Sequence, residues 1–181
     1  MKEKIKGFAR KIGATFEGEV GILRTLAGEH AEVSTLMDDI LSSDSPESKA
    51  EKHYPTIRKK LLLHLRAEQH VLYSACERFD ETGEMIQDSR AEHREIEQLL
   101  GELDSMPVDA PAWMERFSIL QRSVAEHVED EEMVLFPRCK HQFESDQLRE
   151  LDDDYKAAKD ELEDTVGDIS MHRTGTERPS V

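Results

Sequence analysis

The sequence repeats its histidines, glutamates and apolar residues at an interval of 63 positions. The shift needs no gap and superposes three pairs of side chains that commonly bind metals: His30 on His93, His64 on His127 and Glu68 on Glu131. The apolar residues follow the same shift, including Val33 on Ile96, Leu36 on Leu99, Tyr73 on Phe136 and Cys76 on Cys139. Because an internal repeat defines the structural unit, we expect two similar helical hairpins, each with a lone His followed 34 residues later by His-x3-Glu.

Helix-forming residues dominate the chain, and only 9 Gly and 6 Pro interrupt its 181 residues. Apolar residues recur at three- and four-residue intervals, and no stretch alternates convincingly with a period of two. The fold class expected is therefore all-α. With short loops, two repeated hairpins predict an up-down-up-down four-helix bundle, to which one further C-terminal helix is added.

The pattern also predicts the helix boundaries. We expect helices at about 15–41, 84–106, 111–136 and 145–166, with a turn at 80–83. The second helix has two possible starts, because Pro46 suits the first helical position whereas Pro55 can break a helix.

These boundaries give a simple domain organisation. Residues 1–14 form an N-terminal extension, in which Ile5, Phe8 and Ile12 are spaced as in a short capping helix. The bundle spans 15–143, and the C-terminal helix at 144–167 has enough apolar residues to pack on it. Residues 168–181 show no periodicity and are expected to be a disordered tail.

Charge limits the partners. The chain has 40 acidic and 24 basic side chains and a formal net charge of −16, so it should repel phosphate backbones and anionic lipids. We expect neither nucleic acid nor membrane as a partner. The N-terminal residues lack the apolar stretch of a secretory signal, and the two Cys lie far apart in sequence, which favours a cytoplasmic location. We expect Cys76 and Cys139 to lie at one level as buried thiols; a redox-linked disulfide is the less favoured alternative.

The repeated polar residues should meet inside the bundle. His30 lies 11 residues before the expected end of its helix, and the other histidines lie at comparable distances from the turns, so all four can share one level. In each His-x3-Glu motif the two side chains lie one turn apart on the apolar face.

Several buried polar and charged side chains are costly unless something satisfies them. A pair of cations would remove that cost, and a set of imidazoles and carboxylates suits iron, manganese or zinc. A single His on an apolar face is more often an ordinary core residue, but two in-phase copies of the set favour a metal site. The remaining histidines are expected to be solvated or incidental: His53, His70, His141 and His172.

At these motifs the sequence resembles the hemerythrin-like (HHE) family. The resemblance covers about residues 20–140 and rests on Glu29-His30, His64-x3-Glu68 before Val71-Leu72-Tyr73, Glu92-His93, and His127-x3-Glu131-Glu132 before Leu135-Phe136-Pro137. It implies a four-helix bundle with two iron ions, bridged by two carboxylates and an oxo or hydroxo group. It further implies binding, sensing or reaction with dioxygen, nitric oxide or peroxide, or iron holding and delivery. The implied ligands are His30, His64, His93 and His127, with Glu68 and Glu131 as bridges.

One position departs from the family pattern. Oxygen-carrying hemerythrins have a second His one turn after the His of the third helix, where this chain has Glu97; the repeat mate of Glu97 is Ser34. Glu97 is predicted either as a sixth metal ligand, leaving the Ser34 side open to a small molecule, or as a carboxylate behind the ligands or facing solvent. A carboxylate here disfavours reversible oxygen carriage and favours redox sensing, catalase-like peroxide turnover or iron holding. Whether the chain is an enzyme stays open. Glu132 is the less favoured bridge, because its repeat mate is Gln69.

Overall fold

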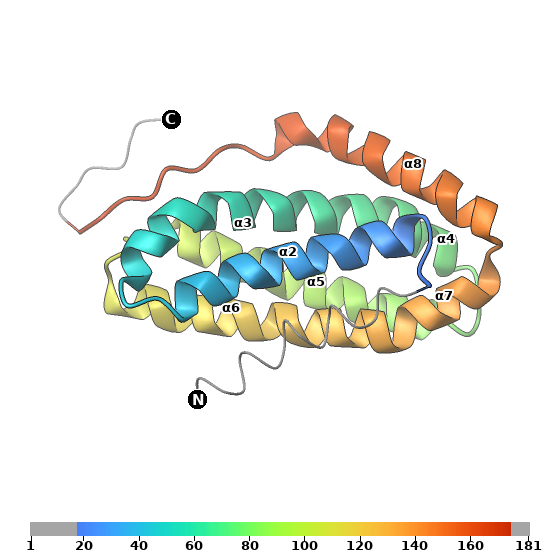
Figure 1. Ribbon diagram of the computed structural model, residues 1–181, viewed down its shortest axis with the longest axis horizontal. Coiled ribbons are helices and arrows are strands. Elements are labelled where there is room, and N and C mark those ends of the chain that lie inside the picture. The colour runs from blue at the N-terminus through green and yellow to red at the C-terminus, as the bar shows by residue number, and fades with distance from the viewer. Residues whose placement is uncertain (1–17, 175–181) are drawn as a thin grey trace.

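The computed structural model describes residues 18–174, and this part of the chain is helical and contains no strand. Four long helices lie side by side, and one more helix runs along their outside (Figure 1). The bundle helices are α2 (Ile22–Leu41), α3 (Pro46–Glu68), α5 (Gly83–Asp104) and α6 (Pro111–Asp130), and the outer helix is α8 (Ser145–Leu162). Helix α2 packs on α3, and α5 packs on α6, as expected for two hairpins. The capping helix expected within residues 1–14 lies outside the described residues.

Proline defines where two of the bundle helices begin. Pro46 and Pro111 occupy the first turns of α3 and α6, where a missing backbone N–H leaves no helical hydrogen bond unmade. Helix α3 starts at Pro46 and continues through Pro55, so the alternative start after Pro55 is wrong.

Both hairpins contain a π-helical segment immediately beyond their second long helix. In the first hairpin, η1 (Gln69–Tyr73) leads into α4 (Ser74–Cys76); in the second, η2 (Glu131–Leu135) leads into α7 (Phe136–Gln142). The expected end near Pro137 is wrong, because Pro137 lies in the first turn of α7, where proline is tolerated. The 63-residue repeat therefore extends to an irregularity that periodicity does not predict.

Helix α2 begins at Ile22, although the apolar pattern predicts a start near Thr15. Residues 18–21 are not helical, and Gly21 has a positive φ of 56°. A Cβ on Gly21 would lie 2.1 Å from the carbonyl oxygen of Leu148 on α8. Glycine is therefore required here both for the backbone conformation and for the close approach of the outer helix.

The chain after α8 is ordered against the bundle through residue 174. After the short 3₁₀ segment η3 (Glu163–Thr165), the backbone N–H of Val108 donates to the carbonyl of His172 at 2.8 Å, and Ile169 and Met171 pack on the core. Residues 168–174, which were expected to belong to a disordered tail, lie against the bundle in the structure, while 175–181 lie outside the described residues. Side chains two residues apart share one face of an extended segment, so a short period-two pattern was the signal overlooked.

The apolar core forms two clusters along the bundle axis. One contains Tyr54, Trp113 and Phe117, and the other contains Tyr73 and Phe136. Between them lies a belt of buried polar side chains, described below. Within residues 18–174, none of the helices has the length and apolar character needed to cross a bilayer.

Candidate metal centre

Four histidines, one from each bundle helix, meet in the belt between the two core clusters. Their exposed fractions are at most 4%. Nε2 of His30 lies 3.1 Å from Nε2 of His64, and Nε2 of His93 lies 3.1 Å from Nε2 of His127. Each hairpin therefore contributes one pair of imidazoles whose Nε2 atoms face one another.

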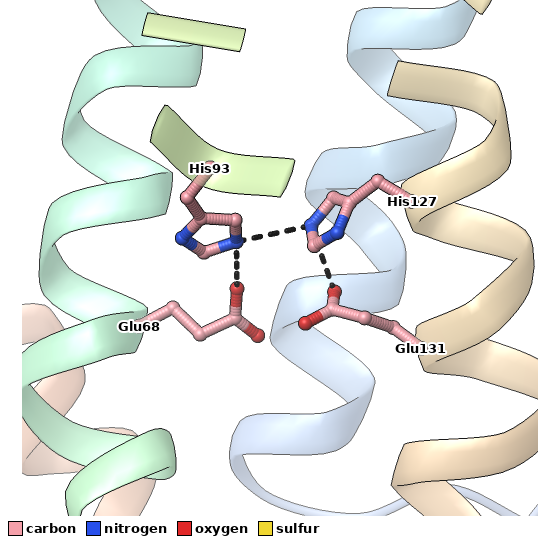
Figure 2. Close-up of side chains that lie close together, drawn as sticks. All are labelled: Glu68, His93, His127 and Glu131. Carbon is pink, nitrogen blue, oxygen red and sulfur yellow. Dashed lines mark hydrogen bonds and ion pairs between the residues drawn. The ribbon is translucent and has the colours of Figure 1, made fainter. Parts of the chain in front are cut away.

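Two glutamates connect these histidine pairs. Glu68 and Glu131 are fully buried. Oε2 of Glu68 lies 3.5 Å from His64 Nε2 and 3.6 Å from His93 Nε2, whereas Oε2 of Glu131 lies 3.4 Å from both His30 Nε2 and His127 Nε2. Figure 2 shows these residues converging, with Glu68 on α3, His93 on α5, and His127 and Glu131 on the continuous column of α6 and η2. Each carboxylate thus reaches both pairs, which is the arrangement that a bridging ligand requires.

Several atoms of this group lack a partner among the described residues. Both carboxylate oxygens of Glu68 and Oε2 of Glu131 are buried and accept no hydrogen bond. Unsatisfied buried carboxylate oxygens cost free energy. The donor atoms also fall into two groups, each within 4.8 Å, namely Glu68, His93, His127 and Glu131, and His30, His64 and Glu131. Six nitrogen and oxygen donors around an unmet negative charge fit cation binding.

A further set of glutamates orients the imidazoles. Nδ1 of His64 lies 3.0 Å from Glu29, Nδ1 of His127 lies 2.9 Å from Glu92, and Nδ1 of His30 lies 3.0 Å from Glu132. A carboxylate that accepts the Nδ1 proton leaves the Nε2 lone pair free for a metal. Nδ1 of His93 has no such partner in the described part of the chain.

The π-helical segment η1 brings Tyr73 into the centre. Its hydroxyl donates to Oε1 of Glu131 at 2.5 Å and lies 2.9 Å from His93 Nε2. On a regular α-helix, residues five apart would be separated by about 140° around the axis, so Tyr73 would not share the face of Glu68. The i→i+5 hydrogen bonding of a π turn restores that alignment. The repeat mate Phe136 has no hydroxyl and instead stacks on His30 with ring centroids 5.9 Å apart.

Burial and charge act on the bridging carboxylates in opposite directions. Burial, followed by the charge of Glu131, raises the pKa of Glu68 well above its usual value of 4.5. Burial also favours a protonated Glu131, but His127 and His30 outweigh it and lower the pKa of that carboxyl. Without a cation, these surroundings therefore favour a charged Glu131 and a protonated Glu68.

The histidines also differ. Burial would lower the pKa of His30, but the carboxylates of Glu131 and Glu132 raise it to about 9. Burial lowers the pKa of His64, and burial together with His127 lowers the pKa of His93 well below 6.5. Neutral imidazoles are the form that binds metals.

Helix α8 covers one of the orienting glutamates. The Tyr155 hydroxyl donates to Oε2 of Glu29 at 2.6 Å and lies 3.3 Å from His64 Nδ1, and Lys159 Nζ donates to Oε1 of Glu29 at 2.5 Å. Burial raises the pKa of Glu29, but hydrogen bonds and charge from His64, with the bonds from Lys159 and Tyr155, lower it to about 2. The outer helix therefore fixes the charged partner of His64.

Glu97 does not join the group. Its carboxylate pairs with the Arg66 guanidinium on α3, with contacts of 3.2 and 3.3 Å, and its side chain is 33% exposed. The expectation of Glu97 as a sixth ligand is corrected by this placement, because a half-exposed arginine offers a carboxylate a better partner than a belt already holding two buried carboxylates. The repeat mate Ser34 is buried, and its hydroxyl has no partner among the described residues.

The other four histidines lie apart from the six converging residues. His53 pairs with Asp39 at 3.0 Å, and His70 is exposed on η1. His141 lies in the last turn of α7 rather than after the helix, and His172 lies in the segment after α8.

Sequence reasoning missed the roles of several residues behind the ligands. These are Glu29, Glu92 and Glu132, which orient histidines, and Tyr155 and Lys159, which hold Glu29. A usable signal existed for Glu29 and Glu92, since both precede a repeated His and are themselves repeat mates.

Comparison with known proteins identifies the family to which the chain belongs. A DNA nickase of Nostoc sp. (strain PCC 7120 / SAG 25.82 / UTEX 2576) is 27% identical over 172 residues, which cover 92% of this chain and 48% of that protein. The chain thus spans about half the length of this relative. No match to a solved structure was found. The family model of the hemerythrin HHE cation binding domain matches residues 21–139, which include all six converging residues. The chain therefore belongs to the hemerythrin HHE cation-binding family.

Proposed function

We propose that this chain is a non-haem di-iron protein that binds or reacts with dioxygen, nitric oxide or peroxide. The observation that carries the proposal is that Glu68 and Glu131 each face one histidine of both pairs. Both also have carboxylate oxygens that lack a hydrogen-bond partner among residues 18–174. His30 and His64 would hold one ion, and His93 and His127 the other. We also propose that the four bundle helices alternate in direction, which agrees with the position of the four histidines at one level.

The metal identity rests on donor chemistry and on the family. Imidazoles and carboxylates suit iron, manganese and zinc, and the nearby thiols are not in the donor groups. Iron is proposed because the family is that of hemerythrin. Zinc and manganese are alternative outcomes of a metal analysis.

The hollow beside the histidines favours small ligands by its size. It reaches His30, His64 and His127, and its other lining residues are Glu29, Val33, Leu61, Leu65, Val124 and Val128. A cavity volume of about 10 Å³ limits entry on this side to very small molecules. Tyr73 holds a proton on the other side, between Glu131 and His93. When bound, a pair of iron ions would supply the redox chemistry.

The test is metal content and ligand response. The protein purified from an iron-supplied host should contain about two iron atoms per chain and show near-ultraviolet absorption that changes on addition of azide or peroxide. A Glu68→Ala variant should lose both, whereas Glu126→Ala, an exposed position on α6, should keep both. Iron that is bound without any response to small ligands would contradict the proposal. Rapid transfer of iron to an acceptor would then favour iron holding and delivery.

Two further activities would be scored with the same variants. Oxygen evolution from peroxide that is lost in Glu68→Ala would make the protein a catalase-like enzyme.

DNA strand cleavage is the second candidate function, because the relative that aligns with 92% of the chain is named a DNA nickase. The net charge of −16 opposes binding of a phosphate backbone. Relaxation of supercoiled plasmid that needs Glu68 would establish this activity, and intact plasmid would exclude it.

A further inference from the structure

Two buried cysteines lie side by side at the end of the repeated hairpins. Sγ of Cys76 on α4 lies 2.7 Å from Sγ of Cys139 on α7, and neither side chain is exposed. Both are free thiols, as expected from the sequence. A disulfide bond is about 2.05 Å long, so the two sulfurs need to approach by only about 0.65 Å to form one.

The pair lies one helical turn from the candidate metal centre. Cys76 follows Tyr73 by three residues, and Cys139 follows Phe136 by three residues, so each thiol lies on the same helical face as one of these rings. Tyr73 contacts Glu131 and His93, and Phe136 stacks on His30. All four side chains belong to one core cluster.

An ordinary buried cysteine serves as a small apolar side chain and needs no partner sulfur. Here both halves of the repeat supply a cysteine. The two sulfur atoms contact each other, whereas ordinary buried cysteines would each pack against apolar side chains. The short distance between the two sulfur atoms allows the pair to lose two electrons together by forming one S–S bond.

We propose that Cys76 and Cys139 form a reversible redox pair whose oxidation closes a disulfide between α4 and α7. Hydrogen peroxide is the oxidant: two S–H bonds and the O–O bond break, one S–S bond forms, and the two thiol protons leave with the peroxide oxygens as two water molecules. The dithiol is oxidised by two electrons and the peroxide is reduced by two electrons. A small dithiol such as dithiothreitol reverses the step by exchange. The proposal does not require iron, because peroxide accepts both electrons.

The experiment counts thiols in the whole chain. The protein is reduced with dithiothreitol, freed of the reductant and divided into an untreated and a peroxide-treated sample. Each sample is then denatured in the presence of N-ethylmaleimide, and its mass is measured by intact-mass spectrometry. Untreated protein should take two maleimide groups. Treated protein should take none, should be lighter by two hydrogen atoms before labelling, should stay monomeric, and should regain both labels after dithiothreitol.

Single variants give the matched controls. Cys76→Ala and Cys139→Ala should each take one label and, under the same peroxide treatment, should gain oxygen on the remaining sulfur instead of losing hydrogen. Circular dichroism checks that both variants fold, and the alanine variants can be replaced by Cys76→Ser and Cys139→Ser. Retention of both labels in treated wild-type protein, oxygen addition to its thiols, or a disulfide between chains would each overturn the proposal. Repeating the assay after removal of metal by a chelator separates this result from the di-iron proposal, since the disulfide should still form.

Discussion

Replacing Glu68 by Gln should stabilise the metal-free protein and destabilise the iron-loaded protein. Glu68 is fully buried, and its oxygens have no hydrogen-bond partner within residues 18–174. Burial together with Glu131 raises its pKa well above 4.5. The folded state therefore holds more protons than the unfolded state above pH 4.5, so its stability falls as pH rises toward the folded pKa. Each pH unit above the usual pKa of 4.5 at which the buried carboxyl stays protonated costs about 1.4 kcal/mol.

Glutamine has nearly the shape and polarity of the protonated acid, so the substitution isolates the protonation cost. Urea denaturation of chelator-treated protein, followed by circular dichroism between pH 4.5 and 7, should show Glu68→Gln more stable than wild type. The difference should vanish near pH 4.5 and grow by at most about 1.4 kcal/mol per pH unit above it. Glu126→Gln, at an exposed position, should change little. With iron present the order should reverse, because the variant loses a ligand that connects both ions. A Glu68→Gln protein that is less stable without metal would refute the reasoning.

Two further predictions concern the residues behind the ligands. Tyr155→Phe removes hydroxyl contacts to Glu29 and His64 and should weaken iron binding about 10- to 100-fold in a chelator competition, whereas Lys156→Ala, on the exposed face of α8, should leave it unchanged; equal loss in both variants would contradict a positioning role. The pKa of Glu29, lowered to about 2, means that its contribution to stability is present above pH 4.5 and is lost as pH falls toward 2. In urea denaturation at a series of pH values, Glu29→Gln should therefore lose less stability than wild type as the pH falls from 4.5 toward 2. An unchanged pH dependence would show that the contacts of Glu29 with His64 and Lys159 contribute nothing to stability.

The six converging residues were predictable because regular helix geometry controls them. The i,i+4 spacing of His64 and Glu68 places both on one face, and the 63-residue repeat supplies the matching pair on α6 and η2. The lone histidines fall within apolar stripes, which define the buried face of α2 and α5. None of these inferences needs the detailed packing between helices.

The position of Tyr73 was not predictable from helical periodicity. Its contact with Glu131 depends on the π turn of η1, which changes the helical phase by about one residue. Apolar spacing carries no record of such a turn. The 63-residue repeat, which aligns Tyr73 with Phe136, does indicate that the two aromatic rings occupy equivalent positions in the two hairpins.

Glu29 and Glu97 show why neighbours in sequence are poor guides to contacts. Glu29 directly precedes His30 but orients His64, because adjacent residues on a helix point about 100° apart and Glu29 faces α3. Glu97 lies one turn after His93, yet it pairs with Arg66 of α3. The choice of partner is decided by charges on the neighbouring helix, and the sequence of one helix does not contain that information.

Departures from the repeat make the two halves of the centre chemically different. His30 has the Glu132 carboxylate at Nδ1, whereas Nδ1 of His93 has no partner among the residues that the structure describes. Nε2 of His93 faces the Tyr73 hydroxyl instead. A carboxylate at Nδ1 increases the donor strength of an imidazole, so the position next to His93 should hold its ion less strongly. Tyr73 also places a hydroxyl proton at the Nε2 atom on that side, whereas the Tyr155 hydroxyl approaches His64 at Nδ1. In a duplicated scaffold, the residues that break the repeat therefore mark the half at which exchange and proton transfer should occur.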